Sequence, residues 1–372
     1  MQSAMTNVVR GLAALATALA LPPAAWAHGD LTVTSWGGAY TRSQMLAYVI
    51  PYEQQTGLTI NMERYNGELA DVRAQVEAYN VKWDVVDLEL GDAIRGCEEG
   101  LLEKIDHSTL PPAPDGTPAA EDFLDGMLPE CAVGQVIWST VVAFDPAQFS
   151  DNAPATLADF FDTSQYPGKR GLRRSPKVNL EWALLADGVP ADQVYDALST
   201  EQGLQRAFAK LDSIKQDIVW WEAGDAPARL LDNEQVAMTS AFNGRIYAAN
   251  ERRERDFGVI WDGQAWDYDM WAIPKRTPKT ASLDAAMAFI EFAVASEQIA
   301  EQAKYISYGP ARRSSMALLD EAVKPHLPTA PENAASALRV DARWWADNQS
   351  RLERAFEHWI ALKEPFETWR VR

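Results

Sequence analysis

Short apolar strands alternate with amphipathic helices along the first third of the chain. Residues 31–36 form a β-branched run, and residues 45–52 carry apolar side chains at the i, i+3, i+4, i+7 spacing of one helix face. The pattern then predicts a strand at 58–65, a helix at 69–79 and a buried strand at 83–90. Strands and helices that alternate in this way are typical of a parallel sheet covered by helices.

The rest of the chain predicts a second α/β region and two long crossing strands. Further strands are predicted at 169–174, 236–241 and 257–261, and further helices at 179–186, 204–211 and 282–296. The apolar runs 135–145 and 266–274 are candidates for strands that cross between two lobes. A chain of 372 residues is also too long for one comfortable core and is typical of two lobes.

The first strand ends in Trp36-Gly37-Gly38, directly before a helix. This arrangement places a large ring and exposed N–H groups at the carboxyl end of a strand, where open α/β sheets bind ligands. Taken alone, the same tripeptide is more often a tight, packed turn. Glu89 lies near the carboxyl end of the third strand, so it either shares this edge or is simply exposed.

The first 27 residues predict a secretory signal peptide. Arg10 closes a short positive start, residues 11–21 are apolar, and Ala25-Trp26-Ala27 is a small-x-small cleavage signature. The apolar run is too short for a bilayer, which takes about 20 residues. We therefore expect residues 1–27 to be removed and the mature chain to be exported and soluble.

Charge and cysteine content narrow the class of protein. The formal net charge of −19 repels nucleic acid and anionic membranes, so we expect neither as a partner. Two cysteines, Cys97 and Cys131, are an even number in an exported chain, which favours a disulfide.

The usual sequence signatures of catalysis and metal binding are missing. The four histidines are scattered, and no zinc spacing, phosphate-binding glycine loop or Gly-x-Ser-x-Gly elbow occurs. We therefore predict no catalytic residue, no metal and no cofactor. An exported α/β enzyme is the alternative, in which Asp267 and Asp269 on one strand face would form an acid/base pair.

Several short motifs follow the signal segment in a fixed order. They are Ser35-Trp36-Gly37, Gln55-Thr56-Gly57, Trp83-Asp84-Val85-Val86, the run from Glu99-Gly100 to Asp106, Asn243-Gly244 and Ala272-Ile273-Pro274. Each is weak alone, but together they make the chain resemble the spermidine/putrescine-type periplasmic solute-binding proteins of ABC transporters, within the bacterial extracellular solute-binding protein family. The resemblance covers essentially the whole mature chain.

The resemblance implies an α/β fold of two lobes, the type II-like periplasmic binding protein fold. Each lobe would be a mainly parallel sheet flanked by helices, with the ligand cleft between the lobes. The first lobe would hold residues 28–141 and 269–310, and the second would hold 142–268 and 311–372. Such a protein is a periplasmic monomer that closes on its ligand and is recognised by an inner-membrane ABC permease.

Polyamine binders of this family hold a methylene chain between aromatic rings and grip each ammonium with carboxylates. The resemblance implies Trp36 as one ring and Asp269 as a carboxylate that meets an ammonium. Trp266 is close enough in sequence to supply the second ring, and Tyr308 matches a cleft tyrosine. A small organic amine, and first of all a polyamine such as putrescine or spermidine, is therefore the expected ligand.

Three features depart from the polyamine pattern. Ser175 and Val178, within or beside the basic stretch 173–177, stand where polyamine binders place two acids. Arg245 stands where a small residue is more usual, and Glu89 where a small hydroxyl residue is common. An acid at one end and Arg245 at the other would suit a zwitterion such as an ω-amino acid. Alternatively, Arg245 points into solvent and Glu89 grips the second ammonium of a polyamine.

Two further alternatives concern the same architecture. A ferric-iron binder would usually need paired tyrosines in the second lobe, and no Tyr-Tyr pair occurs in the sequence. A binding protein that serves a sensor rather than a transporter would carry the same features, and nothing in the sequence distinguishes the two roles.

Overall fold

The computed structural model describes residues 31–67, 69–149, 152–253, 255–276 and 283–362. The expected signal peptide, residues 1–27, lies outside the described residues. Within the described ranges, no helix combines the length and the apolar character needed to cross a membrane.

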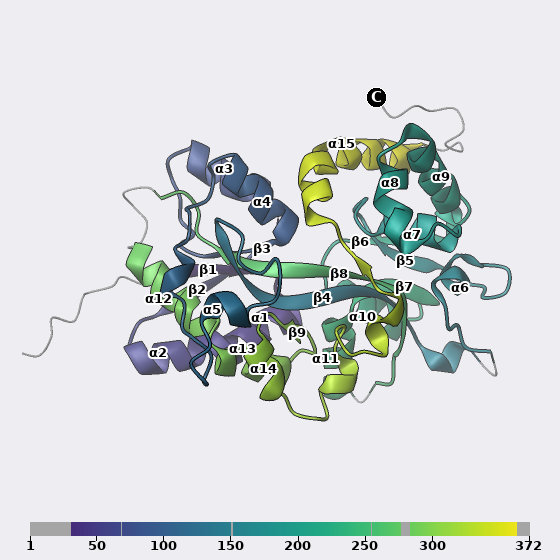
Figure 1. Cartoon of the computed structure of the whole chain (residues 1–372). Helices are drawn as coiled ribbons and strands as arrows, with labels where there is room; N and C mark the ends of the chain where they lie inside the picture. Colours follow the sequence, from purple (N-terminus) through teal and green to yellow (C-terminus); the bar gives the residue numbers. More distant parts are fainter. Residues whose placement is uncertain (1–30, 68, 150–151, 254, 277–282, 363–372) are drawn as a thin grey trace, which may run out of the picture.

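Two long antiparallel strands, β4 (Ala132–Phe144) and β8 (Gly258–Ala272), run through the middle of the molecule (Figure 1). They belong to an eight-stranded sheet with the order β10–β8–β4–β7–β5–β6, in which β3 also pairs with β8 and β9 with β4. The shorter strands are β3 (Val86–Glu89), β5 (Arg170–Arg173), β6 (Ile218–Trp221), β7 (Met238–Phe242), β9 (Gly309–Pro310) and β10 (Leu338–Arg339). A separate parallel pair consists of β1 (Leu31–Ser35) and β2 (Ile60–Arg64).

The shorter strands carry the parallel pairing that the sequence predicts. The pairs β1–β2, β5–β6, β5–β7 and β10–β8 are parallel, whereas β4 is antiparallel to β7, β8 and β9, and β3 is antiparallel to β8. The sheet is therefore mixed, because one crossing strand carries the chain out of the first lobe and the other brings it back.

The segments 257–261 and 266–274, predicted as separate strands, form the single strand β8. Asp262-Gly263 has the composition of a tight turn, and the φ of Gly263 is 67°. The register to β4 shifts at this point, because Val142 pairs with Ile260 but Thr140 pairs with Ala265. Extra residues in one strand form a β-bulge, which bends the strand without ending it.

Helices cover both halves of the sheet. After β1, the helix α1 (Gly38–Gln44), a π-helical turn (Met45–Val49) and α2 (Ile50–Thr56) follow without a break. The other helices of this half are α3 (Leu69–Glu77), α4 (Leu90–Glu98), α5 (Ala119–Asp122), α12 (Leu283–Ala293), α13 (Ser296–Ala303) and α14 (Arg313–Ala317). Those of the second half are α6 (Leu157–Phe161), α7 (Asn179–Ala186), α8 (Val194–Leu198), α9 (Glu201–Asp212), α10 (Ala226–Asp232), α11 (Asn243–Arg253) and α15 (Ala342–Ala361).

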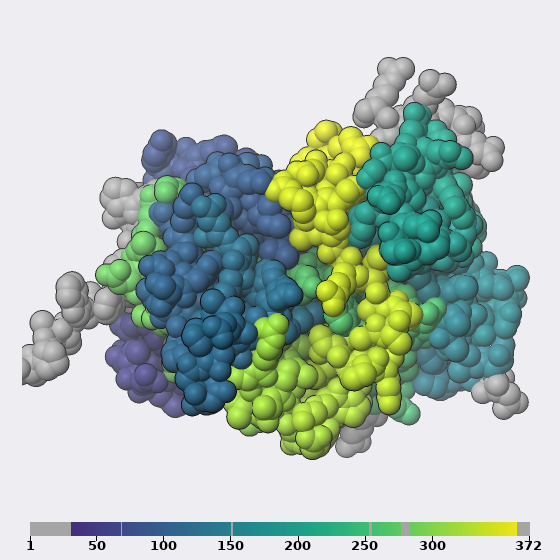
Figure 2. Space-filling model, in the orientation of Figure 1, coloured from purple at the N-terminus to yellow at the C-terminus, as the bar shows by residue number. Residues whose placement is uncertain are grey.

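Two large hydrophobic cores lie on either side of the middle of β4. Val133 at the start of β4 belongs to the first core with Trp271 of β8, and Val142 near its end belongs to the second core with Trp359 of α15. The protein thus has two lobes joined by the crossing strands. Figure 2 shows the first lobe in purple and blue, the second in teal, and the C-terminal segment in yellow between them.

The lobe boundaries named from the sequence stay a prediction. One segment assigned there to the second lobe packs on the first, since Leu319, Val323 and Leu327 share a small core with Ala300 and Ala303 of α13. The C-terminal helix α15, in contrast, packs into the core of the second lobe.

Cys97 and Cys131 form the expected disulfide. Their Cα atoms lie 5.6 Å apart, and the bond ties the end of α4 to the residue that precedes β4. The staple therefore holds a surface helix of the first lobe to the start of a crossing strand.

Candidate ligand-binding site

Two adjoining cavities lie between the lobes. The aromatic cavity has a volume of about 20 Å³, measured as the space open to the centres of water-sized molecules. Its lining residues are Trp36, Tyr40, Glu89, Trp138, Phe242, Arg245, Asp269 and Tyr308. The charged cleft is larger, about 420 Å³ on the same measure, and shares Trp36 and Glu89 with the aromatic cavity. Five rings, two carboxylates and one guanidinium around a small space suit a short ligand that carries charge.

The Trp36-Gly37-Gly38 turn builds one wall of the aromatic cavity. A Cβ on Gly38 would lie 2.8 Å from Nη1 of Arg245, and a Cβ on Gly67 would lie 1.7 Å from the ring of Trp36. Glycine is therefore required so that the guanidinium and the indole can approach the backbone closely. The φ angles of Gly37 and Gly38, 75° and 61°, also lie in the region that favours glycine.

Arg245 is buried beside this turn. Its Nη1 donates to the carbonyl of Gly37 at 3.0 Å and its Nη2 to the carbonyl of Trp36 at 3.3 Å. Only 7% of the residue is exposed, and no carboxylate of the described residues forms an ion pair with it. The alternative in which Arg245 points into solvent is therefore wrong. A buried guanidinium with free N–H groups is suited to binding a carboxylate.

Asp269 supplies the opposite charge from β8. It is 5% exposed and accepts a hydrogen bond from Nε1 of Trp138 at 2.8 Å, but no cation of the described residues pairs with it. Burial raises the pKa of Asp269 well above its usual value, and the charges of Asp87 and Glu89 add to this. An ammonium group in the cavity would relieve this penalty.

Asp87 lies behind Asp269, and the sequence did not single it out. It is fully buried on β3 and accepts a hydrogen bond from Nε2 of Gln44 at 2.7 Å. Burial raises the pKa of Asp87 to about 7, despite several hydrogen bonds that lower it. From the sequence, a carboxylate inside an apolar strand is expected to belong to the core, and only the fold shows that Asp87 lies close enough to Asp269 to raise its pKa.

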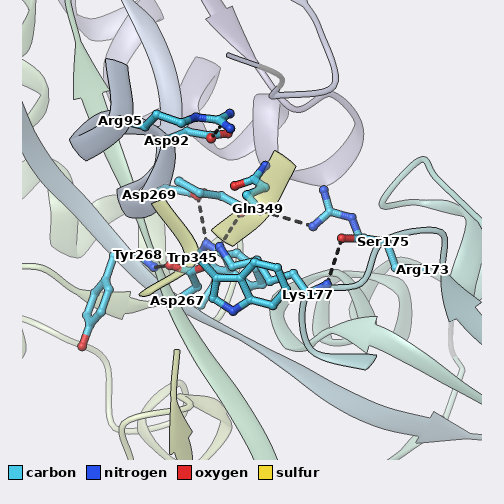
Figure 3. Close-up of polar contacts among 12 residues, drawn as sticks. Asp92, Arg95, Arg173, Ser175, Lys177, Asp267, Tyr268, Asp269, Trp345 and Gln349 are labelled. Atoms are coloured by element: carbon cyan, nitrogen blue, oxygen red, sulfur yellow. Dashed lines mark hydrogen bonds and ion pairs between the residues drawn. The ribbon is translucent and has the colours of Figure 1, made fainter. Parts of the chain in front are cut away.

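Glu89 is already paired within the protein. Nζ of Lys177 lies 2.7 Å from Oε2 of Glu89, and Nη1 of Arg173 lies 3.2 Å from its Oε1. Lys177 also forms an ion pair with Asp267. Figure 3 shows Arg173, the last residue of β5, and Lys177 on the loop that follows, beside Asp267 and Asp269 of β8. Burial raises the pKa of Glu89, but the charges of Lys177 and Arg173 outweigh it and bring the pKa to about 2.

Of the two remaining predicted site residues, one lines the aromatic cavity and the other does not. Tyr308 lines it, with its ring centroid 5.6 Å from that of Tyr40. Trp266 does not line it, because neighbouring residues of a strand face opposite sides and Asp267 faces Lys177. Cζ of Arg339 instead lies over the ring of Trp266, 5.4 Å from its centroid. The rings that sequence reasoning missed are Tyr40, Trp138 and Phe242.

Few side chains in the described part of the chain lie close enough together to bind a metal ion. The one group of His, Cys, Asp and Glu side chains close enough to share an ion there is Cys97, Glu130 and Cys131, and the disulfide already occupies both sulfurs. These residues lie outside both cavities.

Two lobes joined by crossing strands, with a small charged and aromatic cavity between them, define a solute-binding protein. The chain belongs to the bacterial extracellular solute-binding protein family, whose family model matches residues 47–329. It is therefore not an enzyme, and the carboxylates of β8 are not an acid/base pair.

Three similar proteins bear on the kind of ligand. The gamma-aminobutyric acid-binding protein of Pseudomonas aeruginosa is 42% identical over 344 residues, which cover 92% of this chain and 94% of that protein. AgtB of Agrobacterium tumefaciens R10, in complex with agropinic acid, is 30% identical, with a TM-score of 0.79 over 90% of this chain and 99% of that one. The GABA receptor Atu4243 is 30% identical, with a TM-score of 0.77 over the same shares. These ligands do not support the expected polyamine and agree better with the alternative, an amino acid-like ligand.

Proposed function

We propose that this protein is the substrate-binding component of an ABC transporter and captures a small ω-amino acid, such as GABA, in the aromatic cavity. The observation that carries the proposal is that Asp269 and Arg245 line one cavity and neither has an ionic partner among the described residues. A ligand with an ammonium at one end and a carboxylate at the other supplies both missing partners.

The ammonium end is proposed to bind at Asp269. Trp138 donates its indole N–H to Oδ1 of Asp269, the Tyr40 hydroxyl lies beside the same carboxylate, and we propose that the ligand's ammonium binds at Oδ2. Rings of Trp36, Tyr40 and Tyr308 around the same space add cation–π attraction to the charge-assisted hydrogen bond.

The carboxylate end is proposed to bind at Arg245. Two N–H groups of this side chain are held by backbone carbonyls, which fixes the plane of the guanidinium before the ligand arrives. Two cations lie near the ring of Phe242, since Cζ of Arg245 is 5.8 Å and Cζ of Arg173 is 5.5 Å from its centroid. A negative group near this ring would be favoured by both.

We also propose how the protein takes part in transport and where it acts. With the lobe boundaries predicted from the sequence, residues from both lobes line the cavity, since Trp36 and Asp269 fall in the first lobe and Phe242 and Arg245 in the second. A ligand that contacts both lobes favours the closed form, which a membrane permease can recognise. The N-terminal signature supports export to the periplasm, and we propose that the protein acts there as a monomer.

Isothermal titration calorimetry on residues 28–372 tests the proposal. We expect GABA and 5-aminovalerate to bind, and butyrate, butylamine and spermidine to bind at least about tenfold more weakly. Arg245→Gln should weaken GABA binding by about 10- to 150-fold, because charged hydrogen bonds contribute about 1.5–3 kcal/mol. Arg42→Gln, an exposed arginine on α1, is the matched control. Tight binding of spermidine, or an unchanged GABA affinity in Arg245→Gln, would contradict the proposal.

A further inference from the structure

Two strands bring four carboxylates to one face of the sheet beside the cavities. Asp87 and Glu89 are two apart on β3, and Asp267 and Asp269 are two apart on β8, so each pair faces one side. Glu89 is paired directly opposite Asp269 in the β3–β8 ladder. Side chains at such positions lie about 5 Å apart at Cβ, and like charges there repel. Cations or bound protons relieve this repulsion.

Lys177 supplies one cation from the other lobe. Its side chain is 8% exposed, and its Nζ lies between Glu89 and Asp267, 2.7 Å from Oε2 of Glu89. Burial alone would lower the pKa of Lys177, but the charges of Asp267 and Glu89 raise it above its usual value, so this ammonium stays charged. Lys177 lines the charged cleft, and Glu89 lines both cavities. The internal ammonium therefore lies next to the aromatic cavity.

The loop that carries Lys177 is held in an unusual shape. Val178 has φ 70° and ψ −40°, a rare conformation for a β-branched residue. Nδ2 of Asn179 donates to the carbonyls of Arg173 at 2.8 Å and Ser175 at 2.7 Å, which fixes both ends of the loop. Strained backbone that is held in this way is typical of functional sites. Here it directs Lys177 toward the carboxylates.

We propose that Lys177 determines specificity by occupying the carboxylate pair Glu89–Asp267 with an internal ammonium, so that the second amine of an α,ω-diamine finds no free acid. This inference rests on the proposed function, in which Asp269 binds the first ammonium. Asp267 and Asp269 have Cα atoms about 6.7 Å apart along the strand. A staggered chain of four or five carbons spans about that distance, so putrescine and cadaverine are the ligands that Lys177 excludes.

The test compares Lys177→Met with the natural protein by calorimetry with GABA, putrescine and cadaverine. Methionine keeps much of the length of the side chain and removes its charge. We expect the natural protein to prefer GABA over both diamines by at least about tenfold. The variant should gain about 10- to 100-fold in diamine affinity relative to GABA, the range expected for a charged hydrogen bond. Lys169→Met, an exposed lysine directly before β5, should leave the ratio unchanged.

Two further measurements make the result decisive. The double variant Lys177→Met with Asp267→Asn should lose the gained diamine binding, because Asp267 is the carboxylate that loses its cation in the single variant, whereas Glu89 keeps Arg173. If Lys177→Met unfolds, putrescine should restore its far-UV circular dichroism and thermal transition at lower concentration than butylamine, since only a diamine reaches both acids. The inference is overturned if the variant neither gains diamine binding nor is rescued, or if the natural protein binds putrescine as tightly as GABA. Failure of the natural protein to bind any ω-amino acid contradicts the proposed function instead.

Discussion

Replacing Asp269 with asparagine should change binding and stability in opposite directions. The amide keeps the shape of the side chain and can still accept the hydrogen bond that Trp138 donates at 2.8 Å. In the complex, the variant loses a charge-assisted hydrogen bond to the ligand's ammonium, which contributes about 1.5–3 kcal/mol. GABA should therefore bind about 10- to 150-fold more weakly.

The free protein should become more stable in the same variant. Asp269 is 5% exposed, and burial raises its pKa well above its usual value, so its ionised form destabilises the fold at neutral pH. Each unit by which the folded pKa exceeds the unfolded one corresponds to about 1.4 kcal/mol above both values. We therefore expect Asp269→Asn to raise the free energy of unfolding by about 1 kcal/mol or more.

Calorimetry with GABA and urea denaturation at pH 8 measure the two effects. Asp192→Asn, at an exposed position in the second lobe, controls for the chemistry of the substitution and should change neither quantity. If Asp269→Asn binds GABA as tightly as the natural protein, the ammonium does not bind at Asp269. If the variant is less stable, the carboxylate is compensated in the free protein and the electrostatic reasoning is wrong.

Three further predictions follow from the cavity walls and the disulfide. The pKa of Asp87 is raised to about 7, so its contribution to stability is present below about pH 4 and is lost as pH rises through 7. The urea midpoint of the free protein should therefore fall between pH 5 and 8. Asp87→Asn should make this fall smaller. Gly38→Ala and Gly57→Ala share a positive φ and should each cost about 1 kcal/mol of stability. Only Gly38→Ala should weaken GABA binding, because its Cβ would lie 2.8 Å from Nη1 of Arg245, whereas a Cβ on Gly57 would have nothing within 4 Å. Replacing Cys97 and Cys131 by serine should lower the free energy of unfolding by about 3–4 kcal/mol, given the separation of 34 residues, and leave GABA affinity within about twofold.

The fold was predictable because its signals are local. Strand and helix periods each depend on a few neighbouring residues, and the even number of cysteines in an exported chain predicts the disulfide that the structure shows. Strand β8 was predicted as two separate strands because Asp262-Gly263 has the composition of a turn. Only the pairing partner β4 shows that the chain continues as a strand through a bulge.

The lining of the aromatic cavity was partly predictable from the sequence, but ion pairs between residues distant in sequence were not. Trp36, Asp269, Tyr308 and Arg245 line the aromatic cavity as the resemblance implied or the departures suggested. The role of Glu89 depends on Lys177, 88 positions away. No pattern within one strand shows that its carboxylate is already neutralised.

The charges that line the aromatic cavity favour a ligand with no net charge. Two carboxylates, Glu89 and Asp269, and one guanidinium, Arg245, line this cavity. Glu89 is already paired with Lys177 and Arg173. Among the described residues that line the aromatic cavity, Asp269 and Arg245 are therefore the charged side chains without an ionic partner. A dication would leave the guanidinium unpaired and repel it, and a dianion would do the same to Asp269. A zwitterion satisfies both charges and leaves the sum unchanged, which is why an ω-amino acid fits this site better than the polyamine that the same scaffold first suggests.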